Sequence, residues 1–269
     1  MVLDDSFNLL EDYSRLCLRF LDLRKEGLSR WCCRWERLLA VEERLHGEVS
    51  PFVLIGNNDY HYLTYVLLKR IKEPFTLVLF DNHSELCPAP GEELITCGSW
   101  LERALALPTL QGAVVVGAAA ESFAGVAPVS AEKVVYVPPD GEEKEKWRRK
   151  PGGGRLAPFT LSHPQAKTLL LSLIPPGAVY ISVDKDVLRE EFAVTGWEQG
   201  KLRSGQLFEL LATLAGYRRV VGADVCGDPQ FAPWEGWWPE RRRKLRESLR
   251  FNEEFFRLVI ASAAHRKIS

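Results

Sequence analysis

The chain has 269 residues, and its 35 lysines and arginines against 36 aspartates and glutamates leave a formal net charge of -1. This balance excludes the strongly basic field that would attract nucleic acid or an anionic membrane. No run approaches the roughly 20 apolar residues of a membrane span, and the acidic first residues lack the apolar core of a signal peptide, so we expect a cytoplasmic protein.

Cysteine usage points the same way. The six cysteines include no CxxC pair. Their spacing favours reduced thiols over disulfides or a structural zinc site.

The chain begins with helical patterns and continues with strands that alternate with helices. Apolar residues recur at helical spacing over 6–46, with a break at Gly27, and predict two packed helices. Six short apolar runs follow, rich in β-branched residues, at 52–56, 75–80, 113–118, 133–137, 178–184 and 219–225. Such runs are typical of strands buried on both faces of a mostly parallel sheet. Helical patterns cover 62–72, 98–106, 163–175, 204–215 and 239 to about 264.

This order predicts an α/β fold, a three-layer α/β/α sandwich with a mostly parallel sheet. We expect residues 1–269 to form a single domain, in which 1–50 are an N-terminal helical segment. The charged, glycine-rich stretch 138–155 is expected to be an exposed loop or hairpin, with an active-site lid as the alternative. Residues 239–250 are rich in arginine, but pairing along an exposed helix accounts for this better than nucleic-acid binding.

Polar side chains of metal-binding types follow three of the predicted strands. These side chains are Asp59 and His61, then Asp81, His83 and Glu85, then Asp184 and Asp186. Ligands bind at the carboxyl ends of parallel strands, and alternate residues point the same way, so these groups can converge. Each motif alone also fits a helix cap, a turn or a core histidine. Together they favour one or two divalent cations, because unpaired carboxylates in one crevice would be very costly.

Three segments resemble the arginase and agmatinase (ureohydrolase) superfamily. They are "NDYHYLTY" around His61, "DNHSE" from Asp81 to Glu85, and "SVDKD" with Asp184 and Asp186. The resemblance extends over about 52–230 and implies a parallel-sheet α/β/α sandwich with a two-manganese site. By this analogy one ion is held by His61, Asp81, Glu85 and Asp184, and the other by Asp81, His83, Asp184 and Asp186, so that Asp81 and Asp184 bridge.

The chain departs from the family pattern at residues that matter for the reaction. Cys97 stands where the family has a histidine that can move protons. Gly227 stands near the place of the glutamate that grips the guanidinium group, and Asp224 or Asp228 is a candidate substitute for binding substrate. Glu85 replaces an aspartate and adds one methylene to a ligand.

The resulting prediction is a metal-dependent hydrolase of a linear C-N bond, an amidine or an amide. Two ions would lower the pKa of a water between them and present hydroxide as the nucleophile, with Asp186 or Asp81 orienting it and Cys97 as the candidate proton carrier. Oxygen-rich ligands suit Mn²⁺ best, with Fe²⁺ or Zn²⁺ as alternatives. The expected partner is a small-molecule or peptide substrate, and homo-oligomerisation is left open. The alternatives are a deacetylase-like amidohydrolase with one metal and a non-catalytic metal- or ligand-binding protein.

Overall fold

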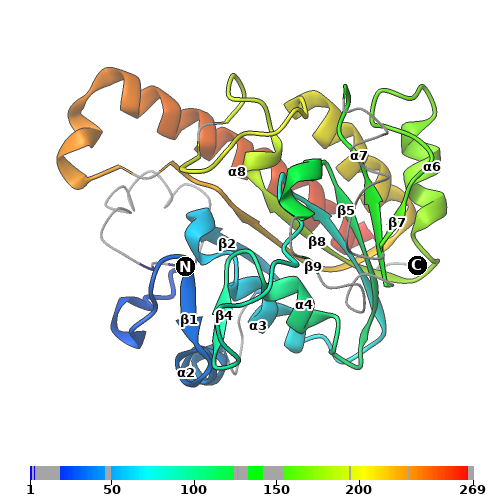
Figure 1. Cartoon of the computed structure of the whole chain (residues 1–269). Coiled ribbons are helices and arrows are strands. Elements are labelled where there is room, and N and C mark those ends of the chain that lie inside the picture. The colour runs from blue at the N-terminus through cyan, green and yellow to red at the C-terminus, as the bar shows by residue number, and fades with distance from the viewer. Residues whose placement is uncertain are drawn as a thin grey trace.

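The structure, a computed structural model, describes residues 1, 3, 19–45, 50–123, 126, 133–141, 154–193, 195–229 and 231–265 (Figure 1). Its centre is a seven-stranded sheet in which every neighbouring pair is parallel. The strands, in spatial order, are β2 (Phe52–Gly56), β9 (Arg219–Cys226), β8 (Ala178–Asp184), β3 (Phe75–Phe80), β5 (Leu110–Val116), β6 (Val134–Val137) and β7 (Arg155–Leu156).

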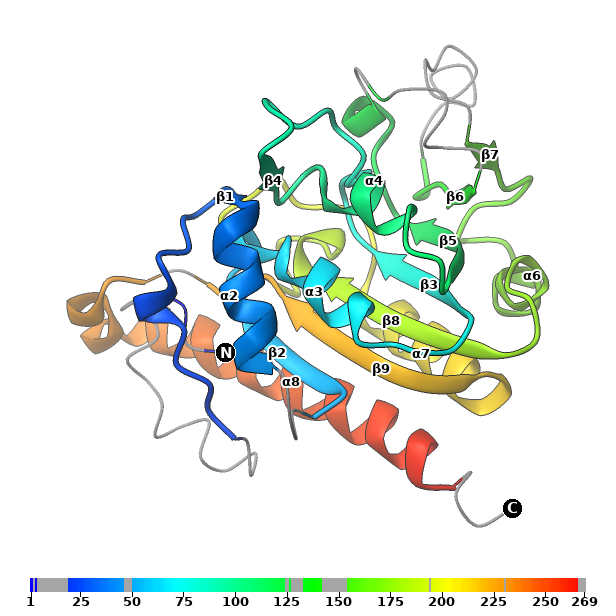
Figure 2. The same ribbon diagram turned by 90° about the horizontal axis from the view of Figure 1, so that it is seen from below.

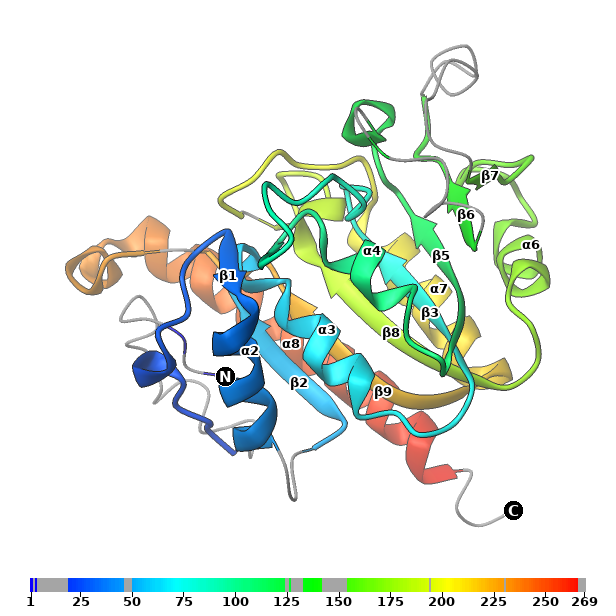
Figure 3. The ribbon, with the colours of Figure 1, turned by 60° about the horizontal axis from the view of Figure 1, so that its bottom comes forward.

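Helices cover both faces of this sheet. On one face lie α2 (Trp35–Leu45), α3 (Leu63–Lys69) and α4 (Trp100–Ala104), and on the other α6 (Ala166–Leu173), α7 (Ser204–Tyr217) and α8 (Pro239–His265). Figure 3 shows α2, α3 and α4 in front of the strands, with α7 and α8 behind them. Each face buries its own apolar cluster, so the two layers of side chains form separate cores.

The continuously apolar runs became strands because the central ones are covered from both sides. Every residue of β3 and of β8 is buried. The predicted bounds of β2, β3 and β8 match the structure, and those of the other predicted strands differ by one to three residues at an end. The α/β/α sandwich is confirmed.

The N-terminal prediction is partly wrong. Residues 35–45 form the expected helix α2, but Trp31 has a left-handed backbone (φ 68°), is 61% exposed and precedes a short strand. That strand, β1 (Cys32–Arg34), pairs antiparallel with β4 (Leu94–Thr96) beside the main sheet (Figure 2). The first predicted helix falls mostly on 4–18, outside the described residues, as do 142–153 of the proposed exposed loop.

Short 3-10 helices connect several elements. They are η3 (Arg24–Glu26), η4 (Asn58–Tyr60), η5 (Ala120–Phe123), η7 (Lys185–Val187) and η8 (Pro233–Trp237). Of these, η4 follows β2 and η7 follows β8, so both begin at the edge of the sheet where the predicted ligands lie. Within the described residues, no helix is long and apolar enough to cross a membrane.

Candidate metal centre

The central strands deliver polar side chains to one edge of the sheet. Matching positions along β8 and β9 are occupied by Tyr180 and Gly222, Ser182 and Asp224, and Asp184 and Cys226. Asp81 directly follows β3, the other neighbour of β8. Since alternate residues of a strand share a face, Asp81, Asp184 and Cys226 come together at the carboxyl edge.

His61 enters this edge from the turn after β2. The Asn57 side chain accepts a hydrogen bond from the Asp59 amide at 2.7 Å and so caps η4, the turn that precedes His61. His61 Nδ1 then lies 3.3 Å from Asp81 Oδ2 and 3.5 Å from Asp184 Oδ2. One imidazole nitrogen therefore faces two buried carboxylates.

His83 makes the corresponding arrangement on the other side of Asp81. Its Nδ1 lies 3.0 Å from Asp186 Oδ2 and 3.4 Å from Asp81 Oδ1. The Asp186 amide donates to Asp184 Oδ1 at 3.0 Å, which leaves Asp184 Oδ2 toward His61. Asp81 thus presents one oxygen to each histidine, an arrangement that would let its carboxylate bridge two ions.

Glu85 adds a carboxylate to the residues around His61 and Asp81, and its backbone is strained. Its φ is 56°, a left-handed conformation that costs a non-glycine residue on the order of 1 kcal/mol. The Leu101 amide, in α4, donates to the Glu85 carbonyl at 3.1 Å and fixes this turn. Glu85 is only 4% exposed, so its carboxylate is directed into the interior and not into solvent.

The described residues include three groups of potential metal ligands. Within each group, the ligand atoms lie within 4.8 Å of one another. The groups are His61, Asp81 and Glu85; Asp81, His83 and Asp186; and His61, Asp184 and Cys226. Apart from the histidine nitrogens that face Asp81 Oδ2 and Asp186 Oδ2, one buried oxygen each of Asp81, Glu85 and Asp186 has no hydrogen-bond partner within the described part of the chain. Buried carboxylate oxygens without partners are costly, and a divalent cation would satisfy them. The residues therefore fit two such ions.

The pKa shifts at the site also indicate that the buried carboxylates favour a nearby positive charge. Burial opposes the charge of both histidines, but the neighbouring carboxylates outweigh it and raise the pKa of His61 to about 10 and that of His83 to about 12. Burial, followed by the charges of neighbouring carboxylates, raises the pKa of Glu85 and Asp184 well above their usual range. Protons thus occupy the places that metal ions would take.

A chain of hydrogen bonds behind His61 sets the orientation of its ring. Tyr180 Oη and Ser182 Oγ donate to the two oxygens of Asp224 at 2.8 and 2.7 Å, and His61 Nε2 lies 3.1 Å from Ser182 Oγ. Because Ser182 gives its hydrogen to Asp224, it accepts from the Nε2 hydrogen of His61. The lone pair of the neutral ring then lies on Nδ1, toward the carboxylates, as metal ligation requires.

A cavity of about 100 Å³ opens over the ligands. It is lined by Asn58, His61, His83, Glu85, Cys87, Cys97, Gly98, Ser122, Asp184, Asp186 and Trp197. Trp197 Nε1 donates to Asp59 Oδ1 at 2.8 Å, and the Trp197 ring stands edge-on to His83 at 5.3 Å between centroids. Nothing in the sequence predicts a role for Trp197, because its contact with Asp59 joins residues 138 positions apart and no local pattern signals it.

The predicted proton carrier lies at the cavity, but the predicted substrate-binding residues do not. Cys97 lines the cavity, whereas Asp224 and Asp228 do not, and the structure offers no support for either as a substrate carboxylate. Asp224 is fully buried behind Ser182, and Asp228 forms a buried ion pair with Lys185.

The lack of space around residue 227 explains why it is a glycine. A Cβ there would lie 2.8 Å from Asp184 Oδ1 and 2.9 Å from the Lys185 amide, and its φ is 87°. These contacts leave no room for a glutamate side chain at this position.

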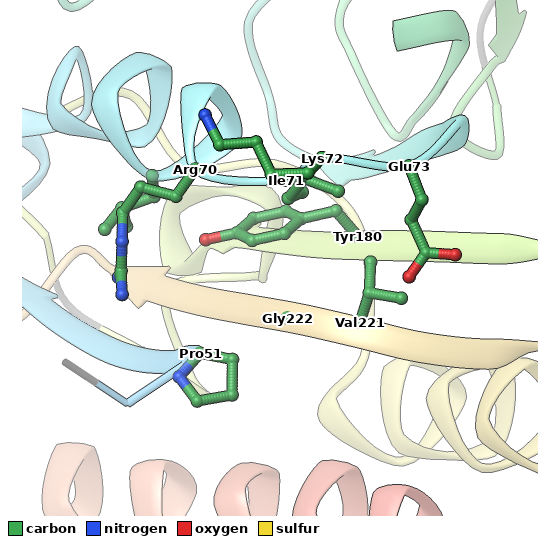
Figure 4. Close-up of a pocket in the computed structure, with 9 residues that line it drawn as sticks. Pro51, Arg70, Ile71, Lys72, Glu73, Tyr180, Val221 and Gly222 are labelled. Carbon is green, nitrogen blue, oxygen red and sulfur yellow. The ribbon is translucent and has the colours of Figure 1, made fainter. Parts of the chain in front are cut away.

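A second cavity, of about 250 Å³, lies away from the ligands (Figure 4). Figure 4 shows Arg70, Lys72 and Glu73 around the ring of Tyr180, beside Gly222 of β9. Its lining includes none of the predicted ligands. The smaller cavity is therefore the candidate site.

The chain is similar in sequence to a Thermotoga maritima protein described only as uncharacterized, at 34% identity over 224 residues, which are 83% of this chain and 75% of that protein. The two belong to one family. No family model matches the chain.

Solved structures extend the comparison. A hypothetical agmatinase from Burkholderia thailandensis superposes with a TM-score of 0.56 at 19% identity, covering 87% of this chain and 67% of that one. The Trypanosoma cruzi formiminoglutamase solved with Mn²⁺ gives 0.50 at 18% identity, covering 82% and 70%. The chain has the ureohydrolase fold. At these identities the likeness establishes the architecture, and the chain is a divergent example of the ureohydrolase fold.

Proposed function

We propose that this chain is a metal-dependent hydrolase that cleaves a linear C-N bond in an amidine or an amide. The observation that carries the proposal is the placement of Asp81 between two histidines, with one carboxylate oxygen toward each Nδ1. The fold of C-N hydrolases supports it, because the agmatinase and the formiminoglutamase share this architecture.

Two divalent ions would be held in two adjoining positions. His61, Asp81, Glu85 and Asp184 would form the first position, and Asp81, His83, Asp184 and Asp186 the second. When bound, such ions activate a water molecule for attack on a planar carbon and stabilise the charge that develops. The second position offers one imidazole and oxygen ligands, a set that suits Mn²⁺.

The chain's own residues would orient the reactants. Asp186 lines the cavity, and its Oδ1 accepts the Asn82 amide at 3.1 Å, so this carboxylate is held in a fixed direction beside the substrate space. Trp197 closes one side of the cavity and is fixed by its bond to Asp59, which would limit access of bulk water.

Substrate recognition would differ from that of an enzyme for free guanidines. Among the described residues that line the cavity, the carboxylates are Glu85, Asp184 and Asp186, and all three belong to the proposed ligand set. No further carboxylate there is left to pair with a guanidinium group, whose burial without a partner costs several kcal/mol. We therefore expect arginine and agmatine to be poor substrates.

Proton transfer would also differ. Burial, followed by the charges of Glu85, Asp59 and Asp184, raises the pKa of the Cys97 thiol well above its usual range. A thiol that stays neutral near pH 7 is a weaker proton carrier than histidine. The leaving amine would then take its proton from another donor, such as solvent water.

The experiment is a screen for released urea, ammonia, formamide and acetate with manganese-loaded protein. The substrates would be arginine, agmatine, guanidinobutyrate, formimino compounds, simple amides and acetyl-lysine peptides, with Asp186→Asn as the matched inactive control. We expect turnover of a non-guanidino substrate that the control loses. Brisk turnover of free arginine or agmatine would refute the inference that Gly227 leaves the site without a carboxylate for a guanidinium group.

The second candidate function is metal or ligand binding without catalysis. The neutral Cys97 thiol and the missing carboxylate at Gly227 favour it. Protein that binds metal but turns over none of these substrates would support it.

A further inference from the structure

Cys226 occupies a position in the metal centre that the resemblance assigns to no ligand. It is the last residue of β9, it is fully buried, and it stands at the register of Asp184 on β8 and of Gly56 on β2. Two residues at the same register of parallel neighbours direct their side chains to the same face. The thiol therefore lies beside a carboxylate of the proposed centre, on the face of the sheet that α2, α3 and α4 cover.

The distances make this position a candidate ligand position. Cys226 Sγ, one nitrogen of His61 and one oxygen of Asp184 all lie within 4.8 Å of one another. Three donors at such spacing can reach a common ion with small side-chain shifts, because Zn-S and Zn-N distances are about 2.3 and 2.0 Å. His61 also belongs to the group with Asp81 and Glu85, so the sulfur lies on the His61 side of the centre.

The backbone after Cys226 keeps this arrangement compact. Gly227 turns the chain at φ 87°, and a side chain there would meet Asp184 Oδ1. Glycine thus allows the end of β9 to approach Asp184 closely while the thiol remains at the edge of the sheet. The buried Glu85 oxygen, which has no hydrogen-bond partner among the described residues, independently indicates a missing cation on this side.

The other thiols in the described part of the chain do not share these features. Cys97 lines the cavity but belongs to none of the three groups of potential ligands among the described residues. Cys33 is buried beside α2, where its Sγ contacts the Arg34 carbonyl at 3.3 Å. These two residues supply matched controls for Cys226.

We propose that Cys226 is a sulfur ligand of the ion on the His61 side, so that the two metal positions differ in preference. This inference rests on the proposed two-metal centre. Thiolate is a soft ligand that favours Zn²⁺, whereas carboxylate and imidazole groups alone accommodate Mn²⁺. The His61 position would then select Zn²⁺, the His83 position would accept Mn²⁺, and the thiol proton would pass to the buffer as the metal-sulfur bond forms.

Cobalt substitution of the reduced full-length protein tests the ligand directly. A thiolate bound to Co²⁺ gives an intense near-ultraviolet charge-transfer band that oxygen and nitrogen ligands lack. We expect this band in the unmodified protein and in the Cys97→Ser and Cys33→Ser variants, and its loss in Cys226→Ser. Persistence of the band in Cys226→Ser would overturn the proposal.

X-ray absorption at the zinc edge gives a second test that needs no substitution. The unmodified protein loaded with one equivalent of Zn²⁺ should show one sulfur neighbour at about 2.3 Å.

Metal affinity gives a third test. Cys226→Ser should lose at least about tenfold in Zn²⁺ affinity, by comparison with the tenfold to hundredfold effects of residues that only support ligands. Its Mn²⁺ affinity should change little.

The outcomes separate the two proposals. Protein that binds two ions with only nitrogen and oxygen neighbours would refute the sulfur ligand and leave the hydrolase proposal intact. Protein that binds no divalent ion would refute both.

Discussion

Replacing Asp228 by alanine should strongly destabilise the fold. Lys185 Nζ is buried and pairs with Asp228 Oδ1. The same Nζ lies 2.5 Å from Ser248 Oγ and 3.2 Å from Asn252 Oδ1. The exposed fractions of the Lys185 and Asp228 side chains are only 1% and 3%. Removing one partner of a buried pair leaves an uncompensated charge and costs about 3–5 kcal/mol, a large part of the 5–15 kcal/mol that stabilises a typical domain.

The assay is urea unfolding of metal-free protein followed by circular dichroism. Glu247→Ala, which breaks the exposed pair with Arg243, is the control and should change the unfolding free energy by less than about 0.5 kcal/mol. Asp228→Ala combined with Lys185→Met should recover much of the loss, because no unpaired charge remains. A loss below about 1 kcal/mol in Asp228→Ala, together with a selective loss of substrate binding, would refute this reasoning and return Asp228 to the substrate site.

The pH dependence of this pair has a definite sign. Burial acts to raise the pKa of Asp228, but the Lys185 charge and the hydrogen bonds to its carboxylate outweigh burial and lower it. Because the folded pKa is below the unfolded value of about 3.9, the contribution to stability is complete at neutral pH and is lost as pH falls through the folded pKa. The difference in unfolding free energy between Asp228→Ala and the unmodified protein should therefore disappear in strong acid.

The remaining predictions concern the metal centre. Asp184→Asn should release more metal, measured by elemental analysis after dialysis, than Asp186→Asn, because Asp184 would touch both ions; equal losses would contradict the assignment. Gly227→Ala should lower both thermal stability and metal content, since its Cβ would lie 2.8 Å from Asp184 Oδ1; an unchanged melting temperature would contradict the contact. Carboxylates raise the pKa of His61 to about 10 and that of His83 to about 12. Metal uptake must displace these protons, so calorimetry in buffers of different ionisation enthalpy should show proton release, with affinity rising from pH 6 to 8; pH-independent uptake would refute this.

The central architecture could be predicted because its signals are local. Strands buried on both faces read as continuous apolar runs, and β3 and β8 were found with their bounds for this reason. The period of two along a strand also brought Asp184 and Asp186 into the candidate set. In the structure, Asp184 ends β8 and Asp186 lies in η7 directly after it.

The rest depended on contacts between distant segments. The approach of Cys226 to Asp184 follows from the pairing of β8 with β9, and strand order cannot be read from apolar runs. The pair β1 and β4 is only three residues long on each side, too short to differ from loop in a sequence pattern. Asp228 is a candidate for substrate binding in the sequence because it stands next to Gly227, whereas its partners on α8, Ser248 and Asn252, lie 20 and 24 residues away and give no local signal.

The most direct test of the two-metal centre is the number of divalent ions bound per chain. Protein prepared without chelator would be saturated with Mn²⁺ and Zn²⁺, separated from free metal, and analysed by elemental mass spectrometry against an Asp81→Asn, Asp184→Asn double variant. The account predicts two ions per chain, and near zero in the variant. No bound metal in the unmodified protein at saturation would contradict the account.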